Sequence, residues 1–196
     1  MGALLLVLTP LRLINEAALA IGRAIGIVAV AFMVIAILIQ VFYRYALNNA
    51  LPWPDEAARF CMLWMTGLMA PTAFRRGGFV AIDTLVVLLP KAIGALLSLL
   101  LLVLSCGVLV IAVQIGWSEV TGFAGRFATA SLYVPTDMSF ENWFRVPRSW
   151  MMASILVGVI MLISVNVELI LRAIVKMLGG ADHLPPISLE EQLGAE

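Results

Sequence analysis

The stretch AIGALLSLLLLVLSCGVLVIAVQIGW, residues 92–117, decides the fold class of this chain, because it is almost entirely apolar and contains no charged residue. A helix that spans a bilayer needs about 20 mostly apolar residues, since each residue rises about 1.5 Å and the hydrocarbon core is about 30 Å thick. A lone strand would leave its backbone groups unpaired in lipid. The stretch therefore predicts a transmembrane helix.

Three further stretches have the length and composition of spans, namely residues 24–43, 57–74 and 150–171. The whole chain agrees with them, since 63% of its 196 residues are hydrophobic and only 12% are charged. Its mean hydropathy is +1.07. A soluble domain of this size cannot bury so much apolar surface in one core. The sequence predicts an all-α integral membrane protein with four transmembrane helices.

The ends of the chain differ from these spans. From Leu11 to Gly22, polar residues recur every three to four positions among apolar ones. This spacing predicts a short amphipathic helix at the bilayer interface ahead of the first span. The run before Pro10 is apolar but lacks a positive start, so a retained segment is favoured over a cleaved signal peptide. Residues 1–178 form the expected transmembrane domain, and the polar residues 179–196 form an expected flexible tail.

Orientation follows from the distribution of Lys and Arg, which favours the cytoplasmic side. With four spans, one side carries Arg12, Arg23, Arg75, Arg76, Lys91, Arg172 and Lys176. The opposite side carries Arg44, Arg59, Arg126, Arg145 and Arg148. The bias predicts that both the N-terminus and the C-terminus are cytoplasmic.

Several functions are disfavoured by composition. The net charge is zero and the basic residues are scattered, which is unlike a nucleic-acid-binding protein. Cys61 and Cys106 lie inside apolar runs, so we interpret them as small core residues rather than as disulfide or zinc positions. The only histidine, His183, lies in the tail, where it cannot be positioned as a base. We therefore predict no catalytic, cofactor-binding or metal residues, and no enzyme activity.

A charged group marks the start of the second span. Asp55 and Glu56 follow Trp53 and Pro54, so they fall in the first helical turn, where the helix dipole stabilises acidic groups. Both are spaced to reach Arg59. One interpretation is a capped helix start with an intrahelical ion pair, and the other is polar contact with a partner subunit. The candidate partner-contact residues are Arg44, Trp53, Asp55, Glu56, Arg59 and Trp64, of which Trp64 lies deeper and is expected to pack against another helix.

Basic residues mark other helix ends. The second span ends at Arg75 and Arg76, which precede Gly77, a pattern typical of a glycine C-cap and of contact with phosphate headgroups. Lys91 and Arg172 are the other candidates for such anchoring. Glu168 precedes Arg172 by four residues, which predicts an ion pair at a helix end. An ion pathway through Glu168 is the alternative, disfavoured because the middles of the spans offer almost no ionisable groups.

Several strings resemble the small membrane subunit of TRAP transporters, the DctQ-like family. They are QVFYRY (residues 40–45), Asn48, LPWPDEAAR (51–59), FRRGG (74–78) and Ile82-Asp83, and the resemblance covers roughly residues 24–92. It implies an inner-membrane subunit with four spans and both ends cytoplasmic. It also implies that this subunit supports a large subunit, which moves an organic acid with sodium by an elevator-like motion after a periplasmic solute-binding protein has captured it.

The resemblance carries over to particular residues. Trp53, Glu56 and Arg59 match the tryptophan, acid and arginine at the start of the family's second helix, and Arg76-Gly77 matches the basic turn at its end. Phe79 stands where family members commonly have a histidine, which indicates packing rather than proton chemistry at that position. The alternatives are a self-sufficient small oligomeric channel or transporter, and a quinone-linked redox subunit.

The connection 118–149 is long for this family and rich in aromatic residues. Val120, Ala124, Phe127 and Ser131 keep helical spacing until Pro135, so the third helix is expected to continue to about Leu132. The connection is expected on the periplasmic face. It either contacts the large subunit or the solute-binding protein, or lines the membrane interface.

Overall fold

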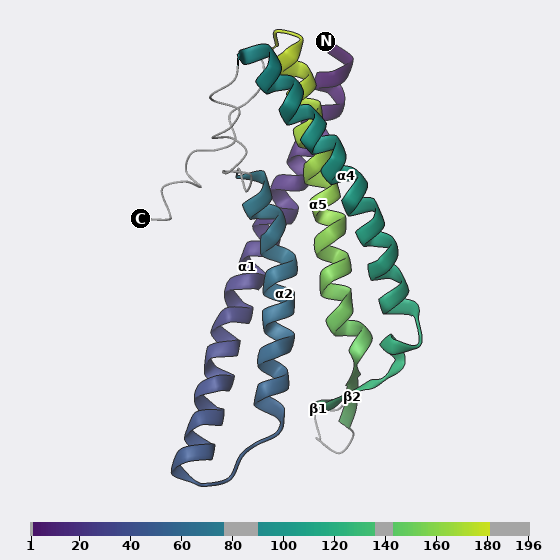
Figure 1. Cartoon of the computed structure of the whole chain (residues 1–196). Helices are drawn as coiled ribbons and strands as arrows, with labels where there is room; N and C mark the ends of the chain where they lie inside the picture. The colour runs from purple at the N-terminus through teal and green to yellow at the C-terminus, as the bar shows by residue number, and fades with distance from the viewer. Residues whose placement is uncertain (1, 77–89, 136–142, 181–196) are drawn as a thin grey trace.

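The fold was obtained as a computed structural model, which describes residues 2–76, 90–135 and 143–180. Long helices dominate it (Figure 1). In chain order the elements are α1 (Gly2–Ala46), α2 (Trp53–Arg75), α4 (Lys91–Thr121), the 3₁₀ turn η1 (Ala124–Arg126), β1 (Ala128–Pro135), β2 (Trp143–Pro147) and α5 (Arg148–Met177). The predicted tail from residue 181 onward and the segment 77–89 lie outside the described residues.

Three of the described helices, α1, α4 and α5, are long and apolar enough to cross a membrane. The helix α2 covers the predicted second span but is not among them, because it is less apolar than the other three. A membrane protein with several apolar helices is therefore confirmed, whereas the count of four spans stays a prediction. Figure 1 shows the N-terminus of α1 and the C-terminal end of α5 at the same end of the bundle.

The helix α1 runs without a break from Gly2 to Ala46, through Pro10. The expected interfacial helix is therefore not a separate element. Two of its polar residues contact other helices: Asn15 is only 3% exposed, and Glu16, although partly exposed, pairs with an arginine of α2. These polar contacts hold the segment against α2 and α5 as a continuous part of α1.

The helices α2 and α5 cross with their backbones in contact at Gly67 and Gly158. A Cβ atom placed on Gly67 would lie 2.3 Å from the carbonyl oxygen of Ser154, and one placed on Gly158 would lie 2.5 Å from that of Gly67. Only glycine fits at such a distance, and small residues are how helices in lipid approach closely. The crossing joins the α1–α2 pair to the α4–α5 pair.

The helices α4 and α5 are tied by a buried amide. Asn166 of α5 is fully buried, and its Nδ2 donates to Ser105 Oγ at 2.7 Å and to Leu102 O at 3.2 Å. Hydrogen bonds of this kind hold helices together in lipid. The contact fixes the rotation of α4 about its axis against α5.

The expected extension of the third helix to about Leu132 is wrong, because α4 ends at Thr121. Gly122 adopts an extended conformation, and the chain then forms an antiparallel β1–β2 hairpin in which Tyr133 faces Arg145 and Val134 faces Phe144. The register is irregular between Ala128 and Tyr133. Backbone pairing with β2 therefore overrode the helical spacing of the apolar residues.

Candidate functional site: a buried polar cluster and a docked hairpin

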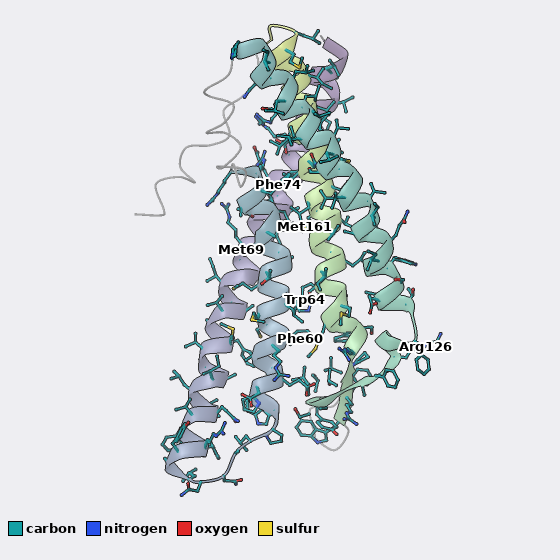
Figure 2. All side chains as sticks on the ribbon, viewed as in Figure 1. Phe60, Trp64, Met69, Phe74, Arg126 and Met161 are labelled. Atoms are coloured by element: carbon teal, nitrogen blue, oxygen red, sulfur yellow. The ribbon has the colours of Figure 1, made fainter. Side chains whose placement is uncertain are left out.

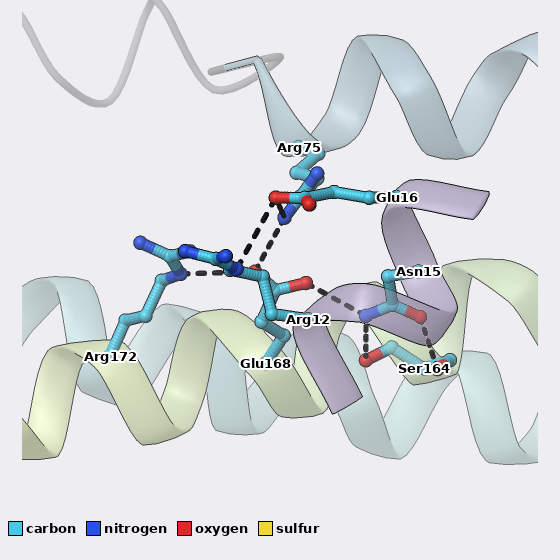
Figure 3. Close-up of polar contacts among 7 residues, drawn as sticks. All are labelled: Arg12, Asn15, Glu16, Arg75, Ser164, Glu168 and Arg172. Atoms are coloured by element: carbon cyan, nitrogen blue, oxygen red, sulfur yellow. Dashed lines mark hydrogen bonds and ion pairs between the residues drawn. The ribbon is translucent and has the colours of Figure 1, made fainter. Parts of the chain in front are cut away.

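Polar side chains from three helices meet near one end of the bundle. We call this the polar cluster; its members are Arg12, Asn15, Glu16, Arg75, Ser164, Glu168 and Arg172 (Figure 3). The members in α1 and in α5 recur at steps of three or four residues, so each set shares one helix face. Arg75 is the last residue of α2. The cluster therefore depends on three helices that the chain places far apart in sequence.

Glu168 lies at the centre of the polar cluster, with no exposed surface. Its Oε1 accepts hydrogen bonds from Arg75 Nη2 at 2.8 Å and from Arg172 Nε at 3.0 Å. Its Oε2 accepts one from Asn15 Nδ2 at 2.8 Å. A buried carboxylate needs such partners, because leaving it unpaired in a medium of low dielectric is very costly.

The amide of Asn15 is satisfied on both sides. Its Nδ2 also donates to the backbone oxygen of Ser164 at 3.3 Å, and its Oδ1 accepts from Ser164 Oγ at 2.6 Å. These bonds tie α1 to α5 one turn before Glu168. The position of α1 along α5 is therefore fixed by matched donors and acceptors.

Glu16 forms the more exposed rim of the polar cluster, with 43% of its side chain accessible. Its Oε1 lies 3.3 Å from Arg75 Nη2 and 3.4 Å from Arg12 Nε. Three guanidinium groups thus face two carboxylates, and Arg75 contacts both of them.

This geometry indicates a fixed contact between helices rather than an ion-binding site on a transport path. Both oxygens of Glu168 are occupied by donors from the chain, so a cation would have to displace an arginine. Figure 3 shows the cluster members side by side along α5, from Ser164 to Arg172, where α1 and the end of α2 meet it. Within the described residues, the ion-pathway alternative for Glu168 has no support from the arrangement.

The polar cluster revises several sequence interpretations. The predicted ion pair between Glu168 and Arg172 is present. Arg75 does not face headgroups, because it is only 6% exposed and pairs with Glu168. The sequence reasoning missed Asn15, Glu16, Arg12 and Ser164 as site residues. The polar spacing in α1 was the available signal, but it was assigned to a water-facing helix side.

A second polar contact joins α2 to the β hairpin. Glu56 Oε1 accepts a hydrogen bond from the Ala130 backbone N–H at 2.8 Å, and Oε2 accepts from both the N–H and the hydroxyl of Ser131. Ser131 Oγ also lies 2.8 Å from the backbone oxygen of Pro52. Burial alone raises the pKa of Glu56, but these hydrogen bonds outweigh it and lower the pKa below the ordinary value. Glu56 therefore holds the hairpin as a charged acceptor.

The other charged residues near the start of α2 take no part in the contact between Glu56 and the hairpin. Asp55 is exposed and accepts a weak hydrogen bond from Gln40 Nε2 at 3.4 Å. Arg59 is exposed, and among residues 2–76, 90–135 and 143–180 no ion pair joins it to Asp55 or Glu56. The predicted intrahelical ion pair is therefore not observed. Arg44 is exposed in the last turn of α1.

Trp64 lies on the side of α2 that faces α5, next to Phe60 (Figure 2). The two ring centroids are 6.3 Å apart. The Trp64 Nε1 atom is buried without a hydrogen-bond partner. This placement is that of a packing residue.

The remaining basic candidates lie at helix ends. Arg76 is exposed, and its backbone N–H caps α2 by donating to Thr72 O at 3.2 Å. Lys91 opens α4. The predicted C-cap Gly77 and the family position Phe79 lie outside the described residues.

One known protein family matches most of this chain. The model for the DctQ component of tripartite ATP-independent periplasmic transporters matches residues 33–176. The chain belongs to this family. A comparison with curated proteins finds no match.

Membership of the DctQ family establishes the general role of the chain. As a TRAP transporter component it is an inner-membrane protein, it associates with other TRAP components, and it is part of a transporter rather than an enzyme. The match covers α2, α4, the hairpin and most of α5, but it begins inside α1. Arg75 and Glu168 thus lie in the matched region of the DctQ component, whereas Asn15 and Glu16 precede it.

Proposed function

We propose that this DctQ component is the small accessory subunit that gives the large TRAP subunit a fixed surface in the bilayer during sodium-coupled uptake of an organic acid. The family match carries the proposal. The polar cluster supports it, since its carboxylate is saturated by the chain's own donors and ties three helices together. A bundle whose helices are fixed against one another is what a supporting subunit needs.

The surface that we assign to the large subunit is the outer face of α4. None of the apolar window of α4 is buried within the chain, compared with 17% for α1 and 33% for α5. Its exposed apolar residues recur every three to four positions: Leu96, Leu100, Leu104, Val108, Ile111 and Ile115. Gly107 lies among them, and a Cβ atom there would meet nothing within 4 Å. A helix of the partner could approach closely at this point.

Polar contacts with the large subunit would be made at the end of the bundle opposite to the polar cluster. Arg44, Asp55 and Arg59 are exposed there and free of ion pairs with one another among the described residues. Trp53 lies at the same end, in the first turn of α2. Glu56 contributes indirectly, by holding the hairpin. The proposed orientation has both chain ends in the cytoplasm. It agrees with Figure 1, in which the start of α1 and the end of α5 lie at the same end of the bundle.

The test is purification of the tagged chain from its native membrane in mild detergent, followed by mass spectrometry. We expect a larger, many-span protein in fixed ratio, and transport by the reconstituted complex only when a sodium gradient, a solute-binding protein and both membrane subunits are present. Recovery of the chain alone as a discrete oligomer that conducts by itself would overturn the proposal in favour of a self-sufficient channel.

A variant of α4 and a control variant of α1 locate the surface. Gly107→Leu adds a side chain in open space, so the isolated chain should fold normally while assembly with the large subunit is reduced. Ile27→Leu, a conservative change on the exposed face of α1, is the matched control and should leave assembly intact. Normal assembly of Gly107→Leu would remove α4 from the proposed interface.

A further inference from the structure

Aromatic side chains gather around the β hairpin and the adjoining ends of α4 and α5. Six of them are 45–78% exposed: Trp117, Phe123, Phe127, Trp143, Phe144 and Trp150. We propose that the hairpin is a membrane-interface element, which lies in the phospholipid headgroup layer rather than projecting into the aqueous phase to receive a protein. This inference goes beyond the proposed function, since it requires only that the chain lies in a bilayer.

The depth of the hairpin is set by Glu56. This residue immediately precedes the predicted second span, and its carboxylate holds the backbone N–H groups of Ala130 and Ser131. The β1 strand therefore lies at the level where α2 begins. The chain returns to helix at Arg148, directly after β2. Both strands are therefore attached to helix starts, β1 to that of α2 and β2 to that of α5.

A cavity at this level is lined by the residue types typical of a membrane interface. It has a volume of about 640 Å³ and lies between the start of α2 and the hairpin, with Trp53, Tyr133 and Trp143 among its lining residues. Trp and Tyr concentrate at the headgroup level, because an amphipathic ring can bury its apolar body and keep its polar atom hydrated. Two tryptophans from distant parts of the sequence thus mark one interfacial plane.

The apolar surface of α4 is replaced by aromatic and polar residues at the end of the helix that adjoins the hairpin. On α4 the exposed row that includes Val108, Ile111 and Ile115 is followed by the exposed polar residues Ser118 and Glu119. Trp117 is exposed in the same helical turn. An exposed apolar surface of this extent is unfavourable in water. A change from apolar to aromatic and polar side chains at one level is typical of the boundary between hydrocarbon and headgroups, so we assign lipid as the occupant of both surfaces.

The charges around the hairpin match an anionic headgroup layer. Arg126 and Arg148 are exposed on either side of it, and Figure 2 shows Arg126 at the end of α4. Basic side chains at this depth attract lipid phosphates. Arg145 acts within the hairpin, since its Nη2 donates to Ala130 O at 2.9 Å and its guanidinium lies 5.6 Å from the Tyr133 ring centroid.

The test measures the depth of a spin label in the full chain reconstituted alone into vesicles of phosphatidylethanolamine and phosphatidylglycerol. Labels are attached to Phe144→Cys, with Ile111→Cys as the hydrocarbon reference and Asn49→Cys as the aqueous reference, after replacement of Cys61 and Cys106 by Ala. We expect the Phe144 label to collide with a water-soluble nickel chelate several-fold less often than the Asn49 label, and with oxygen less often than the Ile111 label.

A nickel collision rate at Phe144 equal to that at Asn49 would overturn the proposal. A label that is aqueous in the chain alone but shielded in the complex with the large subunit would also overturn it, and would make the hairpin a protein-docking element. Quenching of tryptophan fluorescence by brominated lipids gives a second measurement that needs no cysteine replacement. Wild-type protein should lose a larger emission component than Trp143→Phe, and equal losses would contradict the interfacial location.

Discussion

Arg75, the last residue of α2, and Glu168, twenty residues into α5, form an ion pair of 2.8 Å from which water is almost excluded. The pair is completed by Arg172 of α5 and by Asn15 of α1. One carboxylate thus fixes the relative position of three helices. Its loss should affect the whole bundle rather than a single helix end.

Glu168→Gln should destabilise the protein strongly. The substitution removes the buried carboxylate that Arg75 and Arg172 share, and breaking a buried pair in this way costs about 3–5 kcal/mol. Thermal unfolding in detergent, followed by tryptophan fluorescence, measures the change. The control is Glu16→Gln at the exposed rim, which should cost no more than about 1 kcal/mol. Equal losses for the two variants would show that Glu168 is not the centre of the joint.

Asn15 and Ser164 should act as one unit. Because their side chains satisfy each other, Asn15→Ala and Ser164→Ala should each reduce stability, while the double variant should lose less than the sum of the two. A double-mutant cycle on unfolding free energies checks this. Strict additivity would mean that the hydrogen bond between the two side chains contributes nothing.

The crossing of α2 and α5 should not tolerate an added methyl group. Gly158→Ala places a Cβ atom 2.5 Å from a backbone oxygen, and we expect a loss of about 1–3 kcal/mol from overpacking. Gly107→Ala is the matched control on α4, where the same atom meets open space. Unfolding midpoints of the purified chain compare the two. A similar response from both variants would contradict the close crossing.

The hydrogen bonds that Glu56 accepts from the hairpin should weaken at acidic pH. Its pKa is lower in the folded state than the ordinary value of 4.5, so its contribution to stability is fully present above pH 4.5 and is lost as the pH falls through the folded pKa. Hydrogen exchange of the Ala130 and Ser131 amides should therefore accelerate in wild type below pH 4.5, after correction for the intrinsic rate. In Glu56→Gln these amides should be less protected already at neutral pH, and their protection should vary little with pH.

Several features could be predicted from the sequence. The apolar run 92–117 falls within α4, and Asp55 and Glu56 occupy the first turn of α2 as expected. The i,i+4 pairing of Glu168 with Arg172 also follows from local spacing. The TRAP small-subunit family was indicated by the strings around residues 40–59 and 74–83, and the family match confirms it. All of these depend on neighbours along the chain.

Other features could not be read from local pattern. The polar spacing in α1 is compatible with a face toward water or toward the bundle, and only the presence of Ser164, Glu168 and Arg75 opposite it decides between them. Likewise, the residues after Thr121 are compatible with a longer helix until β2 pairs with β1. Arg75 looked like a headgroup anchor until its partner Glu168 was placed beside it.

The sequence by itself determined that the chain is a helical membrane protein of the TRAP transporter small-subunit type, because apolar length and short motifs are properties of contiguous residues. Only the tertiary structure decided which polar groups are buried together and where the hairpin lies. A buried charge is stable only beside its partners, and those partners come from helices that are distant in the sequence.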